Sequence, residues 1–341
     1  MTIVPCDDPA AWNDYVARHV AAVQYHRYEW LEVIERSFGH RPFPLAAVAD
    51  GGRIAGVLPL VLVKSRLFGR FLVSLPFVNY GGLLADDEAA EAALWERAVE
   101  LARDNGAKYL EARHRAPRPF IPRRRQHKVT MVLGLEGAAD VQWKRFDAKL
   151  RNQVRKAEKS GLVARRATPE ELPRFYDVFA RCMRDLGTPV YDRSFFCRVL
   201  EAFPDRAALF LVERGDALVA GGIALGWRDA IEVPWAASLR EYWSMCPNNL
   251  LYWALIRHGI EEGYRRFDFG RSTPGDGPYG FKKQWGAREE PLSWEYWSAD
   301  AGSVPDLSPK NRKFQMAIWL WKHLPLGVTT RLGPVVVRGI P

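Results

Sequence analysis

Residues 266–286 read Arg266-Phe-Asp-Phe-Gly-Arg-Ser-Thr-Pro-Gly-Asp-Gly-Pro-Tyr-Gly-Phe-Lys-Lys-Gln-Trp-Gly286. The stretch begins as a short predicted strand, with its phenylalanines on one face and Asp268 on the other. The glycines and prolines of 272–280 predict a loop, because they do not continue a regular element. Lys282 and Lys283 follow that loop. An acidic strand end with two lysines beyond a glycine loop indicates an anion-handling site; a surface hairpin with solvated lysines is the alternative.

The composition indicates a folded chain with a preference for anionic partners. The chain has 341 residues, of which 48% are hydrophobic and 26% charged, so we expect two domains with packed cores. Its formal net charge of +9 favours nucleic acid, a phosphorylated substrate or acidic lipid, without choosing among them.

The cysteines and the apolar segments bear on the compartment. None of the four cysteines forms a C-x-x-C pair or a zinc-type cluster with histidine, so we expect a reducing environment and no metal. The N-terminus lacks the apolar run of a signal peptide. No stretch reaches the roughly 18 apolar residues of a membrane span. These features predict a cytoplasmic location.

The two halves of the chain predict the same order of elements. The first half predicts helices within 9–38 and over 88–105, and strands over 45–49, 54–63, 71–75 and 109–113. The second half predicts strands over 209–213, 218–226, 231–236 and 266–269, and a helix over 248–262.

An alignment of the halves supports this repeat. Residues 45–56 match 209–221, and residues 101–111 match 258–268, which places Glu111 where Asp268 lies. Because element order and both turns agree, we predict two copies of one α/β unit. Their predicted extents are 1–140 and 141–300, followed by an amphipathic tail over 301–341.

Two basic stretches separate the copies. Residues 113–128 are rich in arginine and proline and are predicted to be loop-like. Residues 143–161 predict a helix with one narrow apolar stripe and a basic remainder that includes Arg151. The basic face is either solvated or a cradle for phosphate or nucleic acid.

Residues 311–324 combine tryptophans with lysine and arginine. The pattern fits either a docked core helix or a peripheral contact at the inner face of a membrane.

Several short motifs occur in a characteristic order. They are Ser37-Phe-Gly-His40, Pro76-Phe-Val-Asn-Tyr-Gly-Gly82, Leu150-Arg-Asn-Gln-Val-Arg-Lys-Ala-Glu158, Gly187-Thr-Pro-Val-Tyr191, Pro247-Asn-Asn-Leu-Leu-Tyr252, Phe267-Asp-Phe-Gly-Arg-Ser-Thr273 and Phe281-Lys-Lys-Gln-Trp-Gly286. With these motifs the chain resembles the Fem-type branch of the GNAT acyltransferase superfamily. More narrowly, it resembles FemAB-related proteins associated with exosortase and exopolysaccharide loci.

The resemblance implies a fold class and a reaction. The fold would be α/β (α+β): two tandem GNAT-like units, each a mixed, mainly antiparallel sheet with flanking helices, with a cleft between them and a C-terminal helical tail. Fem enzymes transfer an aminoacyl group from charged tRNA to an amine of a peptidoglycan precursor, whereas other GNAT enzymes use acyl-CoA.

Two departures leave the donor open. The glycine-containing acyl-CoA loop is absent, because residues 240–249 contain no glycine. The chain also shows no heptad insertion for the coiled-coil arm of tRNA-dependent enzymes.

Acyl transfer to an amine requires a proton acceptor, charge stabilisation at the carbonyl oxygen and alignment of both substrates. Asp268 is the candidate base or acceptor-orienting group, and Lys282 or Lys283 would stabilise an anion, since a lysine of the matching motif lies at the active site of Fem enzymes. Glu232 falls on the strand that matches a common GNAT base position. Structural alternatives are a loop-capping or Arg271-paired carboxylate, solvated lysines and a paired surface glutamate.

The candidate substrate-binding residues carry amide, aromatic or cationic side chains. Asn248 is expected to cap a helix, either structurally or with its free N–H groups aimed at an anion. Asn79 and Tyr80 precede a glycine pair and form either an acceptor contact or a plain turn. Tyr191 and Trp235 wall the cleft or pack in the core. The complete set is Asn79, Tyr80, Arg151, Tyr191, Trp235, Asn248, Asn249, Arg271 and Tyr279.

The sequence therefore predicts an acyltransferase or aminoacyltransferase that forms an amide on a cell-envelope or exopolysaccharide precursor, with acyl-CoA or aminoacyl-tRNA as donor and no metal. Attack would be direct, without a covalent enzyme intermediate. One rival is a non-catalytic assembly factor of the same fold, and a second is a nucleic-acid-binding protein that uses the basic linker. The residues leave the oligomeric state open.

Overall fold

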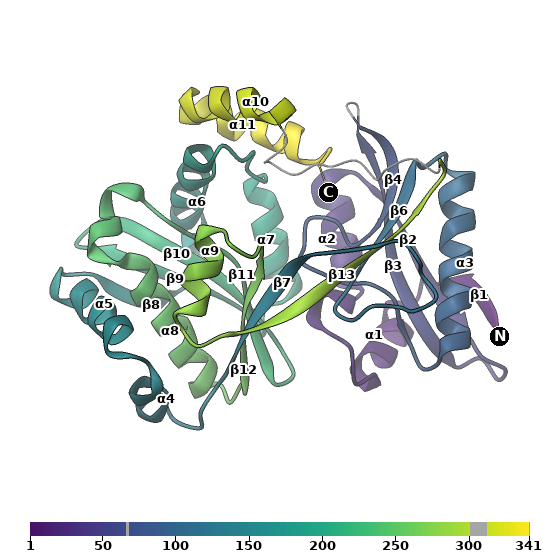
Figure 1. The fold of residues 1–341 in the computed structure, drawn as a ribbon, viewed down its shortest axis with the longest axis horizontal. Coiled ribbons are helices and arrows are strands. Elements are labelled where there is room, and N and C mark those ends of the chain that lie inside the picture. The colour runs from purple at the N-terminus through teal and green to yellow at the C-terminus, as the bar shows by residue number, and fades with distance from the viewer. Residues whose placement is uncertain (66–67, 301–311, 341) are drawn as a thin grey trace. The chain divides into compact units, whose positions relative to one another are not determined.

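A computed structural model of the chain describes residues 1–65, 68–300 and 312–340 (Figure 1), with side chains omitted for 312–314. The chain divides into two compact units. The N-terminal unit takes Met1–Lys128, Pro291–Ser308 and Val335–Pro341, and the C-terminal unit takes Val129–Glu290 and Pro309–Pro334. Neither unit is continuous in sequence, unlike the predicted extents 1–140 and 141–300.

The N-terminal unit is a mixed sheet with flanking helices. Its strands are β1 (Thr2–Pro5), β2 (Arg41–Val48), β3 (Ile54–Ser65), β4 (Gly69–Ser74), β5 (Leu84–Ala85), β6 (Tyr109–His114) and the end of β13 (Arg288–Ser298). Its helices are α1 (Pro9–Arg18), the 3-10 turn η1 (Gln24–His26), α2 (Glu29–Phe38) and α3 (Glu88–Asp104). The β4–β6 pair is parallel, whereas β1–β2, β2–β3, β3–β4, β3–β5 and β6–β13 are antiparallel.

Alternation along β3 explains how this sheet is covered. Leu58, Leu60 and Leu62 pack in one buried cluster with Leu94 and Ala98 of α3. Because side chains alternate along a strand, the residues between them face the other side of the sheet, where they are also buried. The hydrophobic run of β3 thus serves a sheet that is covered on both faces.

The C-terminal unit repeats this plan. Its strands are β7 (Arg124–Gly134), β8 (Val163–Ala167), β9 (Ala207–Arg214), β10 (Ala217–Trp227), β11 (Ala230–Ser238) and β12 (Arg266–Ser272). Its helices are α4 (Ala139–Arg145), α5 (Ala148–Lys159), η2 (Pro169–Glu171), α6 (Leu172–Leu186), α7 (Arg193–Ala202), η3 (Arg240–Met245), α8 (Pro247–Glu261) and α9 (Gly277–Lys283). The β11–β12 pair is parallel, and β8–β9, β9–β10, β10–β11 and β7–β12 are antiparallel.

The two units share a strand–helix–strand core, which confirms the predicted repeat. In the N-terminal unit α3 connects the parallel pair β4–β6, and Val73 lies opposite Glu111. In the C-terminal unit α8 connects the parallel pair β11–β12, and Glu232 lies opposite Asp268. Glu111 and Asp268 therefore occupy corresponding positions.

The final strands are exchanged between the two copies. The strand that follows β6 in sequence is β7, yet residues 129–134 of β7 pair with β12 in the C-terminal unit. The strand that follows β12 is β13, and its residues 293–298 pair with β6 in the N-terminal unit. Each sheet therefore contains one strand from the other half of the sequence.

Two predicted elements were wrong in detail. The helix predicted over 143–161 is divided into α4 and α5, because Asp147 accepts a hydrogen bond from Leu150 N at 2.7 Å and starts a new helix. The loop predicted over 272–280 ends early, because α9 begins at Gly277 with a proline in its first turn.

Two helices, α10 (Arg312–His323) and α11 (Leu326–Val337), follow. Helix α10 packs on the end of α6: a Cβ at Gly187, which has φ +77°, would lie 2.5 Å from Ile318 Cγ2. The opposite face of α10 exposes Met316, Trp319 and Leu320. Among the described residues, no helix has both the length and the apolar character needed to cross a bilayer.

Candidate functional site

A group of buried charged side chains lies in the C-terminal unit; we call Glu232, Asp268 and Lys282 the charged cluster. Glu232 on β11 and Asp268 on β12 are directly opposite in a parallel pair, so both side chains project from the same face of the sheet. All three residues are between 4% and 7% exposed. Ionised groups are rarely buried this deeply unless other charges or hydrogen bonds stabilise them.

The backbone around Asp268 is shaped to hold its carboxylate. Asp268 Oδ1 accepts hydrogen bonds from Thr130 Oγ1 at 2.5 Å and from Gly270 N at 2.8 Å. The pairing of β12 with β7 shifts register just after Asp268, and Gly270 has φ +73°. A residue with a Cβ would be strained there, so this glycine allows the chain to turn its N–H back toward the carboxylate.

Lys282 reaches the same place from α9. Its Nζ donates hydrogen bonds to the carbonyl oxygens of Gly270 at 2.8 Å and Arg271 at 3.0 Å. Burial lowers the pKa of Lys282 to about 8; the charges of Asp268 and Glu232 oppose this shift, whereas that of Arg271 adds to it. The ammonium therefore loses its proton near neutral pH rather than far above it.

Aromatic packing fixes the helix that carries Lys282. Trp285, which follows α9, is 1% exposed and meets the ring of Phe146 edge-on at 5.2 Å. Phe281 on α9 packs edge-on against Tyr252 of α8 at 5.1 Å. These large apolar groups flank Lys282 in sequence, so the lysine is carried into the interior with them.

The charged cluster has the chemistry for moving protons. A lysine that titrates close to working pH is suited to proton exchange with a reacting group. Two carboxylates and a perturbed lysine held together in a folded domain are typical of a functional site, although structural ion pairs also occur. A substrate amine that enters as an ammonium ion would find proton acceptors here.

Lys283 and Tyr279 point elsewhere. Lys283 is exposed, and its Nζ lies 3.9 Å from Glu289 Oε1 and 5.7 Å from the centre of the Tyr279 ring. The Tyr279 hydroxyl donates a hydrogen bond to the same glutamate. The two predicted lysines thus have different surroundings, and only Lys282 joins Asp268.

The start of α8 differs from its prediction. The N-cap is Cys246, with φ +59°, and Pro247 occupies the first turn, so the prediction that Asn248 caps the helix was wrong. Asn249 is buried and donates a hydrogen bond through Nδ2 to Gln153 Oε1 at 3.1 Å, which connects α8 to α5. Arg151, also on α5, is half-buried, and its Nε has no partner among the residues described.

The predicted aromatic residues of the C-terminal unit lie in a packed cluster. Trp235 is buried, and its ring meets those of Phe195 and Phe196 edge-on at 5.4 Å. Tyr191 is half-buried and contacts Phe195 at 5.1 Å. The backbone oxygen of Tyr191 accepts a hydrogen bond from the Tyr176 hydroxyl at 2.9 Å. These contacts hold α6 and α7 together.

Asn79 and Tyr80 belong to the N-terminal unit. Tyr80 is 3% exposed, its ring meets Tyr25 edge-on at 5.2 Å, and it lines a cavity described below.

Thr130 was missed from the sequence. It contributes to the charged cluster from β7, and neither that strand nor its pairing with β12 was predicted. The signal was the apolar run of residues 129–133, which follows an arginine- and proline-rich stretch that reads as loop.

Comparison with known proteins places this geometry in a family context. Residues 144–283, which include the whole charged cluster, match the acetyltransferase (GNAT) domain model. A search of curated proteins found no match.

Solved structures with the same fold include three whose names are informative. FemX is 17% identical with a TM-score of 0.66, covering 86% of this chain and 97% of its own. The C-terminal domain of a putative lysylphosphatidylglycerol synthetase from Agrobacterium fabrum is 13% identical with a TM-score of 0.56, covering 84% and 91%. A tandem GNAT protein from the clavulanic acid biosynthesis pathway is 16% identical with a TM-score of 0.55, covering 89% and 99%. The chain thus carries a GNAT acetyltransferase domain at residues 144–283, in a tandem GNAT fold of the Fem-like branch.

Proposed function

We propose that the protein is an acyltransferase that forms an amide on an amino group of a cell-envelope or exopolysaccharide precursor. The observation that carries this proposal is the charged cluster inside the matched GNAT domain. FemX and the lysylphosphatidylglycerol synthetase domain, which share the fold, support an envelope-related acceptor by analogy.

Each member of the charged cluster has a proposed role. Asp268 and Glu232 accept the proton that the acceptor ammonium loses before or during attack on the acyl carbon. Lys282 balances their charge while it holds the backbone of Gly270 and Arg271, and its positive charge favours the oxyanion that forms on the acyl group. The amine nitrogen then forms the new bond as the thiolate or tRNA hydroxyl leaves with a proton.

The donor is an acyl-CoA or an aminoacyl-tRNA. The exposed basic side chains of α5, among them Arg155, Lys156 and Lys159, would attract either polyanion. Transfer from each donor to amino-sugar and peptide amines is followed by mass spectrometry of the acceptor. Asp268→Asn and Lys282→Met should abolish transfer, and Lys283→Met, the same change at an exposed neighbour, should not.

Two outcomes would contradict this function. A folded protein that transfers nothing from either donor class favours the assembly-factor alternative. If charge reversal at Arg155 and Lys156 removed a nucleic-acid affinity while no acyl transfer was ever detected, the nucleic-acid-binding alternative would replace it.

We also propose that α10 contacts the surface of an anionic membrane. Met316, Trp319 and Leu320 are 73%, 59% and 52% exposed on one helical face, and Lys322 follows them. Exposed tryptophan beside basic residues suits the lipid interface. Residue 311 of the predicted segment 311–324, and the side chains of 312–314, lie outside the described residues.

Sedimentation with vesicles tests the membrane contact. The protein should bind vesicles that contain phosphatidylglycerol more strongly than vesicles of phosphatidylcholine alone. The double variant Trp319→Ser/Leu320→Ser should lose this binding. Self-association of the protein that the same variant abolishes, without any vesicle binding, would assign the face to a second copy of the chain instead.

A further inference from the structure

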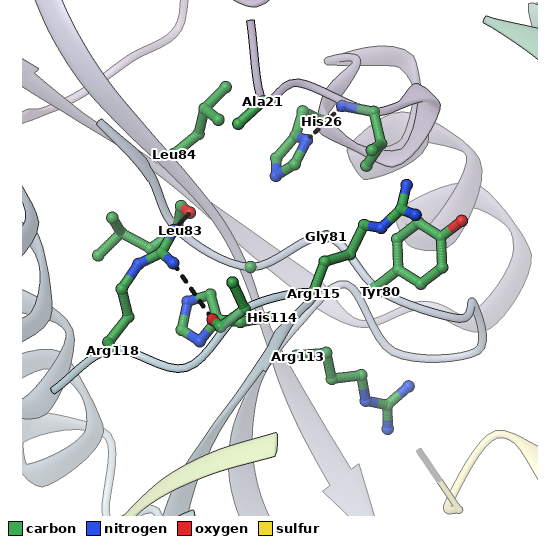
Figure 2. Close-up of a pocket in the computed structure, with 13 residues that line it drawn as sticks. Ala21, His26, Tyr80, Gly81, Leu83, Leu84, Arg113, His114, Arg115 and Arg118 are labelled. Atoms are coloured by element: carbon green, nitrogen blue, oxygen red, sulfur yellow. Dashed lines mark hydrogen bonds between the residues drawn. The ribbon is translucent and has the colours of Figure 1, made fainter. Parts of the chain in front are cut away.

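The N-terminal unit contains a cavity of about 100 Å³ (Figure 2). It is lined by two histidines, three arginines, one tyrosine and small or aliphatic residues: Ala21, Val23, His26, Tyr80, Gly81, Gly82, Leu83, Leu84, Arg113, His114, Arg115, Ala116 and Arg118. Ala21 and Ala116 are exposed, so the cavity opens to solvent at that side. The volume corresponds to roughly three water molecules, which suits a small ligand or the end of a larger one.

The contact between His114 and Glu295 determines where the imidazole carries its proton. His114 Nδ1 lies 2.5 Å from Glu295 Oε2, although the groups are not aligned for a regular hydrogen bond. The other oxygen, Oε1, accepts a hydrogen bond from Arg118 N at 2.7 Å. Burial lowers the pKa of His114, so the ring is neutral. A bare Nδ1 would set two lone pairs against each other at 2.5 Å, so the proton is on Nδ1 and the lone pair is on Nε2.

This lone pair is directed toward Gly82, which also lines the cavity. A Cβ on Gly82 would lie 2.7 Å from His114 Nε2. Nε2 is buried and has no hydrogen-bond partner among residues 1–65, 68–300 and 312–340. Buried polar atoms are nearly always paired, so this nitrogen calls for a donor from a molecule in the cavity.

The remaining polar side chains give the cavity a positive lining. Ion pairs of 2.7 Å, with Glu111 and with Glu91, fix Arg113 and Arg118 in its wall. Arg115 runs along the cavity with its guanidinium 5.3 Å from the centre of the Tyr80 ring (Figure 2). No described lining residue is acidic.

The second histidine adds no positive charge and no free acceptor. Burial lowers the pKa of His26 to about 3, so it stays neutral. Its Nδ1 accepts a hydrogen bond from Val23 N at 3.0 Å, and the ring also bonds to the backbone of Gly82. Nε2 of His114 is therefore the imidazole acceptor that remains for a ligand.

We propose that this cavity binds a small anion that retains a hydroxyl group. The hydroxyl donates to His114 Nε2, and the anionic oxygens pair with Arg115. Hydrogen phosphate and the hydroxycarboxylate end of a larger molecule both have this chemistry. A phosphodiester does not, because it lacks the O–H. The site is independent of acyl transfer by the C-terminal unit.

Two matched pairs of probes test the site by calorimetry on the full chain. Inorganic phosphate and sulfate have the same shape, but only phosphate carries an O–H at neutral pH. Lactate and propionate differ in the same way and represent the carboxylate source. We expect each hydroxyl-bearing anion to bind at least about tenfold more tightly than its partner, the value of one hydrogen bond to a charged ligand.

Variants assign the preference to His114. His114→Asn keeps a donor toward Glu295 but removes the acceptor at Nε2, so it should abolish the preference for the hydroxyl. His114→Gln places an amide oxygen near the Nε2 position and should retain part of it. Arg115→Gln should weaken both hydroxyl-bearing anions about tenfold or more, and Arg115→Lys should weaken them less.

Equal binding of phosphate and sulfate, or of lactate and propionate, overturns the role of His114. Failure of all four anions to bind overturns the site. If His114→Asn does not fold, Arg115→Gln remains decisive, since unchanged affinity in that folded variant refutes the proposal.

Discussion

Replacing Lys282 with methionine tests how the charged cluster contributes to stability. The folded pKa is about 8, against an ordinary value of 10.5 in the unfolded chain. Between these values the unfolded state binds the proton and the folded state does not, so stability must rise with pH. A shift of this size corresponds to about 3 kcal/mol in total, of which about 2 kcal/mol falls between pH 7 and pH 9.5.

The assay is urea denaturation at a series of pH values, followed by tryptophan fluorescence. Wild type should gain about 2 kcal/mol over this range relative to Lys282→Met, because methionine has no proton to lose. Lys283→Met is the matched control and should follow wild type, since that ammonium is exposed to solvent. If wild type and Lys282→Met change in parallel from pH 7 to 9.5, Lys282 is not held as a buried ammonium and the reasoning fails.

Three further predictions concern single side chains. Asp268→Asn should lower kcat for acyl transfer on the order of 10²-fold with a smaller effect on the melting temperature, and a variant with full activity would exclude Asp268 from the reaction. Gly82→Ala should destabilise the N-terminal unit and displace His114, because its Cβ would lie 2.2 Å from Cδ2 of that ring; an unchanged melting temperature and anion affinity would contradict the packing described. Arg165→Met should make unfolding easier as the pH falls from 5 toward 2, because Arg165 lowers the pKa of Glu171 to about 2 and the carboxylate contributes stability only while ionised. The loss should stay below about 1 kcal/mol because the pair is solvent-accessible, and an acid-unfolding curve that coincides with that of wild type would show that the pair contributes nothing.

The repeated core could be predicted because its signals are local. Hairpins such as β2–β3 combine alternating apolar residues with a glycine turn, and helices such as α3 end at a positive-φ glycine, Gly106. These patterns are readable in a window of about ten residues. The correspondence of Glu111 with Asp268 followed from aligning those windows.

The exchanged strands could not be predicted, because their partners are distant in sequence. Ser293 of β13 lies opposite His114, and Val132 of β7 lies opposite Asp268. Nothing within either strand identifies a partner more than a hundred residues away. Thr130 was missed for the same reason.

Lys282 and Lys283 show how far local sequence carries a site. Both follow one glycine-rich segment, and nothing in the pair of letters distinguishes them. Because α9 is a helix, successive residues point about 100° apart, so one lysine is carried inward by its aromatic neighbours and the other outward. A prediction of loop over 272–280 hides this difference.

The exchange of β7 and β13 has a consequence for synthesis on the ribosome. The β13 residues that complete the N-terminal sheet begin at Ser293, 179 positions after His114 at the end of β6 (293 − 114). At roughly 5 to 20 residues per second, β6 waits on the order of 10 to 35 s for that partner. During this interval its free edge is open to pairing with other chains. A nascent chain stalled or truncated before residue 293 is therefore a substrate for chaperones rather than a folded half-protein.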